Sequence, residues 1–135
     1  MADGNNLFQI EIITPERIFY QGEASMVEFT AQDGDIGVLK GHIPLTTVVS
    51  PGVLTIKEPG GDKLAALMAG FAEILPDKVT ILAEVAEWPE EIDPHRAEAA
   101  KERAEKRLSS HGSEIDVMRA EVALKKALVR LDLKR

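Results

Sequence analysis

Hydrophobic and polar side chains alternate along most of the first two thirds of the chain, the period of a half-buried β-strand. The alternation is clear in Ser25–Ala31, where Val27 and Phe29 face one way and Glu28 and Thr30 the other. The same pattern predicts strands over Leu7–Ile13, Ile18–Tyr20, Ser25–Ala31, Ile36–Leu39, Thr46–Ser50, Val53–Lys57, Lys63–Met68, Phe71–Leu75 and Lys78–Val85.

Glycine and proline separate these segments at short intervals, as in Asp33-Gly34-Asp35 and Pro51-Gly52. Gly22 is expected to end the second strand. Lys63–Met68 is ambiguous, because its alanines and leucines would also suit a helix. Many short strands with frequent turns and no intervening helical period favour a two-layer antiparallel sandwich or flattened barrel over residues 1–87.

The pattern becomes helical after a linker at residues 88–92. Asp93 is a good helix N-cap, and Pro94 suits the first helical position because its missing N–H would have no partner there. Helices are predicted from Pro94 to Leu108 and from Glu114 to about Leu131. Ser109–Gly112 breaks them, and Ser113 caps the second with Asp116 three residues on, as in a capping box.

Each predicted helix carries a stripe of small apolar residues. The first stripe holds Ala97, Ala100, Ala104 and Leu108, and the second holds Val117, Ala120, Leu124, Ala127 and Leu131. A short connection makes the pair an antiparallel hairpin over residues 93–135. Because these stripes contain few large side chains, they bury too little apolar area to hold the hairpin rigidly. The hairpin must therefore pack against the sandwich or against another protein. The predicted fold class is α+β.

Charge divides the chain at the same place. Residues 1–92 hold five basic and fifteen acidic side chains, a net charge of −10, whereas residues 93–135 have a net charge of +3. The acidic part would repel nucleic acid, so nucleic-acid binding is disfavoured. The chain has no cysteine, no apolar run long enough to span a membrane and no signal-peptide pattern, which predicts a soluble, cytosolic protein.

Catalytic motifs such as a phosphate-binding loop, a metalloprotease helix or a nucleophile elbow are missing from the sequence. Basic residues instead line both helices at helical spacing: Arg96, Arg103 and Arg107 on the first, and Arg119, Lys126 and Arg130 on the second. The two stripes could converge on a polyanion, with Asp93 at the entry. The alternative is a charged outer face that keeps the hairpin soluble. His42, His95 and His111 are most simply solvent-facing.

Several longer motifs resemble the epsilon subunit of bacterial F-type ATP synthases, across essentially the full chain. They are Asp33–Leu45 with its Gly-His-x-Pro-Leu element, Pro51–Leu54, Gly70–Ile74, Val79–Ala83, Ile92–Ala97, Arg119–Glu121 and Ala123-Leu124. The resemblance implies a non-catalytic rotor subunit of a proton- or sodium-translocating enzyme, peripheral on the cytoplasmic face of the cell membrane. It would couple the catalytic head to the c-ring.

The resemblance also implies partners and sites. The sandwich would bind the gamma subunit and touch the c-ring through the loops of Asp35 and His42. The hairpin would either fold onto the sandwich or extend along gamma into the alpha/beta head and block ATP hydrolysis. No cofactor is required, but in some members ATP binds the folded form. Carried over, that site would hold Glu87, Ile92, Asp93, Arg96, Ala97, Arg103, Lys126 and Arg130.

Lys126 stands where the members that bind ATP well have arginine, and lysine lacks the guanidinium fork. One alternative is therefore an interaction-only stalk subunit that no longer binds nucleotide. A further alternative is a small enzyme that uses Asp93 and the arginines.

Overall fold

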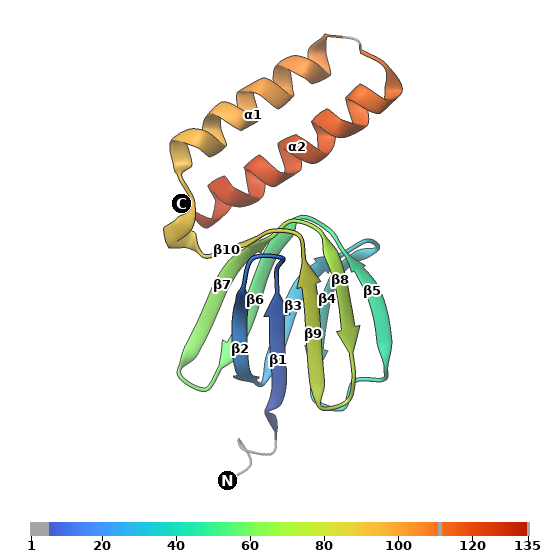
Figure 1. The fold of residues 1–135 in the computed structure, drawn as a ribbon, viewed down its shortest axis with the longest axis vertical. Helices are drawn as coiled ribbons and strands as arrows, with labels where there is room; N and C mark the ends of the chain where they lie inside the picture. The colour runs from blue at the N-terminus through green and yellow to red at the C-terminus, as the bar shows by residue number, and fades with distance from the viewer. Residues whose placement is uncertain (1–5, 111, 135) are drawn as a thin grey trace.

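The computed structural model describes residues 6–110 and 112–134 and shows a β-sandwich with a pair of helices against one end (Figure 1). The strands are β1 (Phe8–Ile13), β2 (Ile18–Ala24), β3 (Met26–Ala31), β4 (Gly34–Leu39), β5 (Leu45–Val49), β6 (Gly52–Glu58), β7 (Gly61–Leu67), β8 (Gly70–Ile74), β9 (Lys78–Ala83) and β10 (Ala86–Glu87). A single-turn 3₁₀ helix (Pro89–Glu91) leads to α1 (Pro94–Ser109) and α2 (Glu114–Leu133). The predicted fold class is confirmed.

The strands form one sheet that curls into a nearly closed barrel. Their order is β10-β7-β6-β3-β5-β8-β9-β1-β2, and β4 pairs with β3 beside this path. Among the pairings that the described strands make, β1 with β9 is parallel and the others are antiparallel. The open side is bridged where the Tyr20 hydroxyl donates a hydrogen bond to the Glu58 carboxylate.

The prediction that Gly22 ends the second strand is wrong. β2 continues to Ala24 because it pairs with β1 as far as Phe8. Gly22 is needed inside the strand, since a Cβ there would lie 2.6 Å from the Tyr20 hydroxyl oxygen. The ambiguous segment Lys63–Met68 is mostly strand, because β7 pairs with β6 along its whole length.

The predicted strand Lys78–Val85 ends at Ala83, and a separate short strand, β10, follows and pairs with β7. Two residues are too few to produce a periodic signal in the sequence. The short strand still matters for the structure, because its pairing with β7 places the chain at the edge of the sheet immediately before the helices begin.

A mainly aliphatic core fills the sandwich. Its largest fully buried side chains are Phe29, Ile10, Ile12, Leu54, Ile56, Leu67, Met68, Ile74, Ile81, Val27, Val38 and Val49. Buried aliphatic area of this kind is the main source of folding free energy. The sandwich therefore has the means to fold without the helices.

The two helices form the predicted antiparallel hairpin, each slightly longer than expected. Asp93 caps α1 by accepting from the N–H groups of His95 and Arg96 at 2.9 and 3.3 Å. The Ser113 hydroxyl accepts from the Asp116 N–H at 3.2 Å and caps α2. The buried seam consists of Ala97, Ala104, Ala120 and Ala127. His111, in the predicted break, lies outside the described residues.

A small second cluster attaches the hairpin to the sandwich. Ala66, Met68 and Ile92 are buried there, and Val129 and Leu133 from the last turns of α2 pack against them. In Figure 1, α2 lies between α1 and the sandwich, and its C-terminal end is the part that approaches the strands. The described contact between the two units is thus concentrated near one end of the hairpin.

Candidate functional site

A cavity of about 280 Å³ opens where the linker, the start of α1 and the end of α2 meet. Seven of the eight residues predicted for the nucleotide site line it, namely Glu87, Ile92, Asp93, Arg96, Ala97, Arg103 and Arg130. They come from β10, the linker and both helices, so the cavity exists only while the hairpin lies against the sandwich. We call it the hinge pocket.

Lys126 is the predicted site residue that does not line the hinge pocket. It is half-buried on α2, one turn before Arg130. The second helix therefore contributes a single cation to the lining.

Local structure explains how the start of α1 faces the pocket. Ile92 is buried in the second cluster, which fixes the chain immediately before the helix. Asp93 must then turn its carboxylate toward the free N–H groups of the first helical turn. Arg96 and Arg103 are two turns apart on α1 and therefore project from one face. The cap role of Asp93 predicted from the sequence is thus realised within the pocket.

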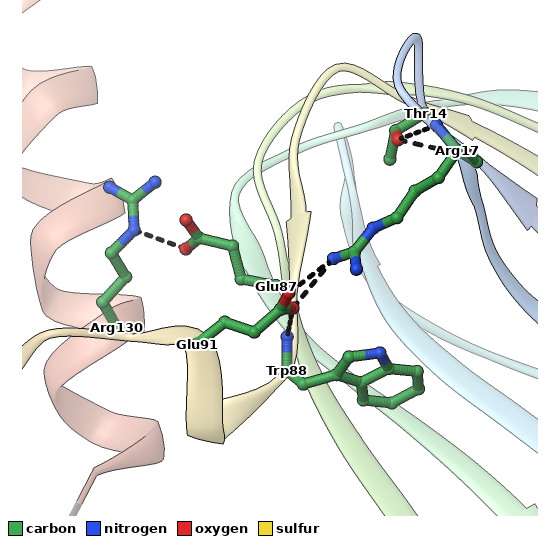
Figure 2. A network of polar contacts seen from close by, with 6 residues as sticks. All are labelled: Thr14, Arg17, Glu87, Trp88, Glu91 and Arg130. Atoms are coloured by element: carbon green, nitrogen blue, oxygen red, sulfur yellow. Dashed lines mark hydrogen bonds and ion pairs between the residues drawn. The ribbon is translucent and has the colours of Figure 1, made fainter.

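An ion pair joins the two units across the pocket. The Arg130 Nε of α2 lies 2.7 Å from Glu87 Oε1 at the end of β10. Figure 2 shows the arginine reaching from the helix toward the linker, and only its Nε is used in this contact. Among the described residues the two terminal nitrogens of the guanidinium make no hydrogen bond, so their donors can bind a ligand.

The carboxylates in the pocket wall are all engaged by donors within the protein. Glu87 is paired with Arg130, Asp93 accepts from two helix N–H groups, and Glu91 accepts from Arg17 and from the Trp88 N–H. Arg96 and Arg103, by contrast, have no acidic partner within 4 Å among the described residues. Counted with Arg17, which pairs with Glu91 from outside the lining, four guanidinium groups accompany three carboxylates, so the pocket offers a small excess of positive charge to a ligand.

Glu91 and Ala100 also line the pocket, although the sequence predicts neither as a site residue. The helical pattern places Ala100 in the seam, and Glu91 lies in the predicted linker. No local pattern in the sequence indicates the partner of Glu91. Arg17 lies 74 positions earlier and places its Nη2 at 2.8 Å from both carboxylate oxygens. Hydrogen bonds from Arg17, and then from the Trp88 N–H, lower the pKa of Glu91.

A larger cavity of about 450 Å³ lies on the other side of the linker and shares Glu87 and Glu91 with the hinge pocket. Its lining also includes Glu16 and Glu84, with Arg17 as the basic member. Four carboxylates against one guanidinium would repel a phosphate chain. Charge, rather than size, therefore selects the hinge pocket as the candidate anion site.

The two residues predicted to contact the c-ring do not come together. Asp35 lies near the start of β4, at the end of the sandwich that carries the hairpin, and accepts a 2.8 Å hydrogen bond from Thr30. His42 follows the other end of β4, where the neighbouring Gly41 N–H donates to the Pro76 carbonyl. The two residues thus lie near opposite ends of β4, and among the described strands β4 pairs with β3 alone.

The described residues contain no group of three or more histidine, aspartate or glutamate side chains arranged to hold a metal ion. No helix in the described ranges is long and apolar enough to cross a membrane.

Two family models together match almost the whole chain. The model described as the β-sandwich domain of the ATP synthase delta/epsilon chain matches residues 7–89, and that of its long α-helix domain matches residues 90–134. A curated ATP synthase epsilon chain of Caldanaerobacter subterraneus subsp. tengcongensis is 50% identical over 127 residues, covering 93% of this chain and 92% of that one. Another from Bacillus velezensis is 45% identical, covering 93% and 95%.

Solved structures show the same fold at low identity. A chain of the Euglena gracilis mitochondrial ATP synthase superposes with a TM-score of 0.80 at 24% identity, covering 93% of this chain and 79% of its own. A chain of the Tetrahymena thermophila mitochondrial ATP synthase central stalk and c-ring has a TM-score of 0.71 at 11% identity, covering 95% and 96%.

Proposed function

Because this chain belongs to the family of ATP synthase delta and epsilon chains, we propose that it is a non-catalytic central-stalk subunit whose hairpin regulates ATP hydrolysis. In this role it couples the catalytic head to the c-ring of a proton- or sodium-translocating enzyme, at the cytoplasmic face of the membrane. ATP would act on it as an allosteric ligand and not as a substrate.

The hinge pocket is the single observation that carries the regulatory part of the proposal. It gathers three guanidinium groups, from Arg96, Arg103 and Arg130, around one opening. Guanidinium groups bind phosphate oxygens well because their planar forks offer several aligned donors. Since Arg96 and Arg103 have no acidic partner among the described residues, a phosphate chain would supply the negative charge that pairs with them.

The position of the pocket gives the regulatory mechanism. A ligand that touches β10, the linker and both helices binds only the folded hairpin, so it shifts the population toward that form. At a ligand concentration one hundred times its Kd, this shift amounts to about 2.7 kcal/mol. The extended hairpin, which lacks the pocket, would be the form that enters the alpha/beta head and inhibits.

A row of apolar side chains, exposed except for the half-buried Ile13, supports gamma as the partner of the sandwich. Cross-strand pairing aligns Val48, Phe71, Leu82, Ile13 and Ile18 across β5, β8, β9, β1 and β2. Phe71 and Ile18 are each 58% exposed, which is unusual for such large apolar side chains in one contiguous row. We assign this row to the gamma interface.

The c-ring contact is proposed along the free edge of β4. Asp35 and His42 lie at opposite ends of this strand, so a partner must follow the strand to meet both. Substituting either residue should therefore weaken coupling to ion transport without disturbing nucleotide binding at the hinge pocket.

Calorimetry with ATP on the isolated chain tests the nucleotide site. Arg96→Ala and Arg103→Ala should each weaken binding about tenfold or more, since a charge-assisted contact is lost in each. Arg107→Ala is the matched control, because it removes the same charge from α1 outside the pocket and should bind almost normally. If all three variants bind ATP as tightly as the parent chain, ATP does not bind in the hinge pocket and the site assignment is wrong. If the parent chain binds no ATP, the interaction-only subunit is the correct assignment.

Deletion of residues 93–135 tests inhibition in the reconstituted ATP synthase. The complex with the sandwich alone should hydrolyse ATP faster than the complex with the full chain. Equal rates would show that the hairpin of this chain does not inhibit.

A further inference from the structure

We propose that Arg17 is a positioning residue of the hinge pocket: from the sandwich side it holds Glu91 and the linker in the conformation that forms the pocket wall. The inference rests on the proposed function for its ligand, but the contacts that carry it belong to the ligand-free chain. Arg17 does not itself line the hinge pocket and would act through Glu91.

Several hydrogen bonds hold the turn that carries Arg17 in one conformation. Thr14 and Arg17 exchange backbone hydrogen bonds of 2.9 and 3.3 Å, and the Thr14 hydroxyl adds contacts to the backbone of Arg17. Pro15 restricts the backbone between them. Thr14 is buried, so the turn is anchored in the sandwich. The backbone of Arg17 is therefore held in place relative to the sandwich, and its side chain extends from this fixed position.

From this point the guanidinium reaches the linker. Figure 2 shows Arg17 and Arg130 approaching the linker from opposite sides, one from the sandwich and the other from the hairpin. The Arg17 Nη2 bridges both oxygens of Glu91 at 2.8 Å. Glu91 Oε1 also accepts from the Trp88 N–H at 2.9 Å, which closes the 3₁₀ turn on itself.

Aromatic packing holds the other end of the same turn. The Trp88 ring stacks on Phe19 with a centroid separation of 4.2 Å and an interplanar angle of 16°. The Arg17 guanidinium carbon lies 5.1 Å from the centre of the Phe19 ring. Stacking and charge pairing thus fasten residues 88–91 to β2 and to the β1–β2 turn, so the linker is part of the sandwich rather than of the moving arm.

Charge gives Arg17 a second effect on the ligand. Glu91 stands in the wall of a pocket that is proposed to hold phosphates. A carboxylate without its cation would repel them and would also be free to turn toward Arg96 or Arg103. Arg17 removes both effects, because it neutralises Glu91 from the side away from the ligand.

Five variants of the full chain, including Glu91→Gln with and without Arg17→Ala, test the proposal by calorimetry with ATP. Arg17→Ala should weaken binding about twofold to fivefold, the range expected for an exposed but well-aligned ion pair. Arg17→Lys should restore most of the loss, because a single nitrogen makes both contacts. In a chain that already carries Glu91→Gln, Arg17→Ala should have little further effect. The control is Lys40→Ala, which removes a charge at the opposite end of the sandwich.

Non-additivity is the decisive result. If Arg17→Ala weakens binding equally with and without Glu91→Gln, or if Lys40→Ala has the same effect, Arg17 acts only as general surface charge and the proposal is overturned.

Hydrogen exchange without nucleotide separates this proposal from the proposed function. The Glu91 and Ile92 N–H groups donate to the carbonyls of Trp88 and Pro89. Their exchange should become faster in Arg17→Ala by about the same twofold to fivefold and stay unchanged in Lys40→Ala. If the parent chain binds no ATP, the proposed function fails, and faster exchange would still support the linker clamp. Unchanged exchange in Arg17→Ala would overturn it.

Discussion

The sandwich and the hairpin are built on opposite principles of packing. The sandwich buries large side chains such as Leu54, Ile56 and Phe29 completely, whereas the helices bury four alanines and leave Ile115 and Met118 exposed. Alanine seams let helices approach closely but remove little apolar area from water. The sandwich is therefore a stable body, and the hairpin depends on whatever surface it lies against.

This difference is what a movable arm requires. An arm with its own large core would need no support from the sandwich, and its release would not respond to a ligand at their junction. Here the described attachment includes Val129 and Leu133 on the second cluster, the Glu87–Arg130 ion pair and a hydrogen bond from Lys134 to the Pro89 carbonyl. Contacts of this size are comparable in free energy with the binding of one nucleotide.

Separating the two units should produce the largest effect. A fragment of residues 1–92 should fold and unfold cooperatively, because its core is complete. A peptide of residues 93–135 should lose most of its helix, since isolated helices without a core are marginal in water. Circular dichroism of both fragments measures this. A peptide as helical as the hairpin in the full chain would contradict the comparison.

Single truncations should repeat the contrast on a smaller scale. Leu54→Ala in the sandwich core should lower the free energy of unfolding by about 2–5 kcal/mol. Leu124→Ala in the half-buried seam should cost about 1 kcal/mol. Chemical denaturation followed at Trp88, the single tryptophan, reports on the sandwich, and circular dichroism reports on the helices. Similar losses in both variants would mean that the hairpin has a core of its own.

Alkaline pH should act on the sandwich through Tyr20. Burial, and then the hydrogen bond to Glu58, raise the pKa of Tyr20 above its usual value near 10. The stabilisation is thus fully present below pH 10 and is lost as the pH rises toward the higher folded-state pKa. Tyr20→Phe should cost about 1–2 kcal/mol at pH 7 and lose this pH dependence. An unchanged alkaline limb of the stability curve in Tyr20→Phe would contradict this assignment.

The smallest predicted effect separates the two roles of Asp93. Asp93→Ala removes the cap and should destabilise the hairpin by about 1 kcal/mol, whereas Asp93→Asn keeps an acceptor and should cost only a few tenths. Thermal melts of the helical signal measure both. If Asp93→Asn melts like the parent chain but loses ATP affinity, the negative charge has a role in binding beyond the cap.

Local signals in the sequence were sufficient for most elements of the fold. Alternation and turn residues located the strands, and Asp93-Pro94 located the start of α1 to the residue. The prediction that Gly22 ends the second strand is wrong because glycine can end a strand or, as here, lie inside it and leave space for the ring of Tyr20. Lys63–Met68 could be a strand only because β6 pairs with it, which is information from elsewhere in the chain.

The candidate site shows the same division. Arg96, Arg103 and Arg130 follow from helical spacing, and the resemblance adds Glu87 from β10. The sequence alone could not predict the role of Arg17, since this role depends on a contact with Glu91 between distant segments. Lys126 fell outside the lining although helical spacing put it on the same stripe as Arg130.

The central claim is that ATP favours the folded hairpin, and an inter-label distance measures this most directly. The chain has no cysteine, so cysteines introduced at the exposed positions Thr46 and Ser109 can carry spin labels without interference. Leu133→Ala should weaken the attachment enough to populate both forms without nucleotide. ATP at a concentration close to the Kd of the parent chain should then increase the short-distance population, and Arg103→Ala should remove most of this increase at the same concentration. A distance distribution that ATP leaves unchanged, or shifts toward the long distance, would contradict the account.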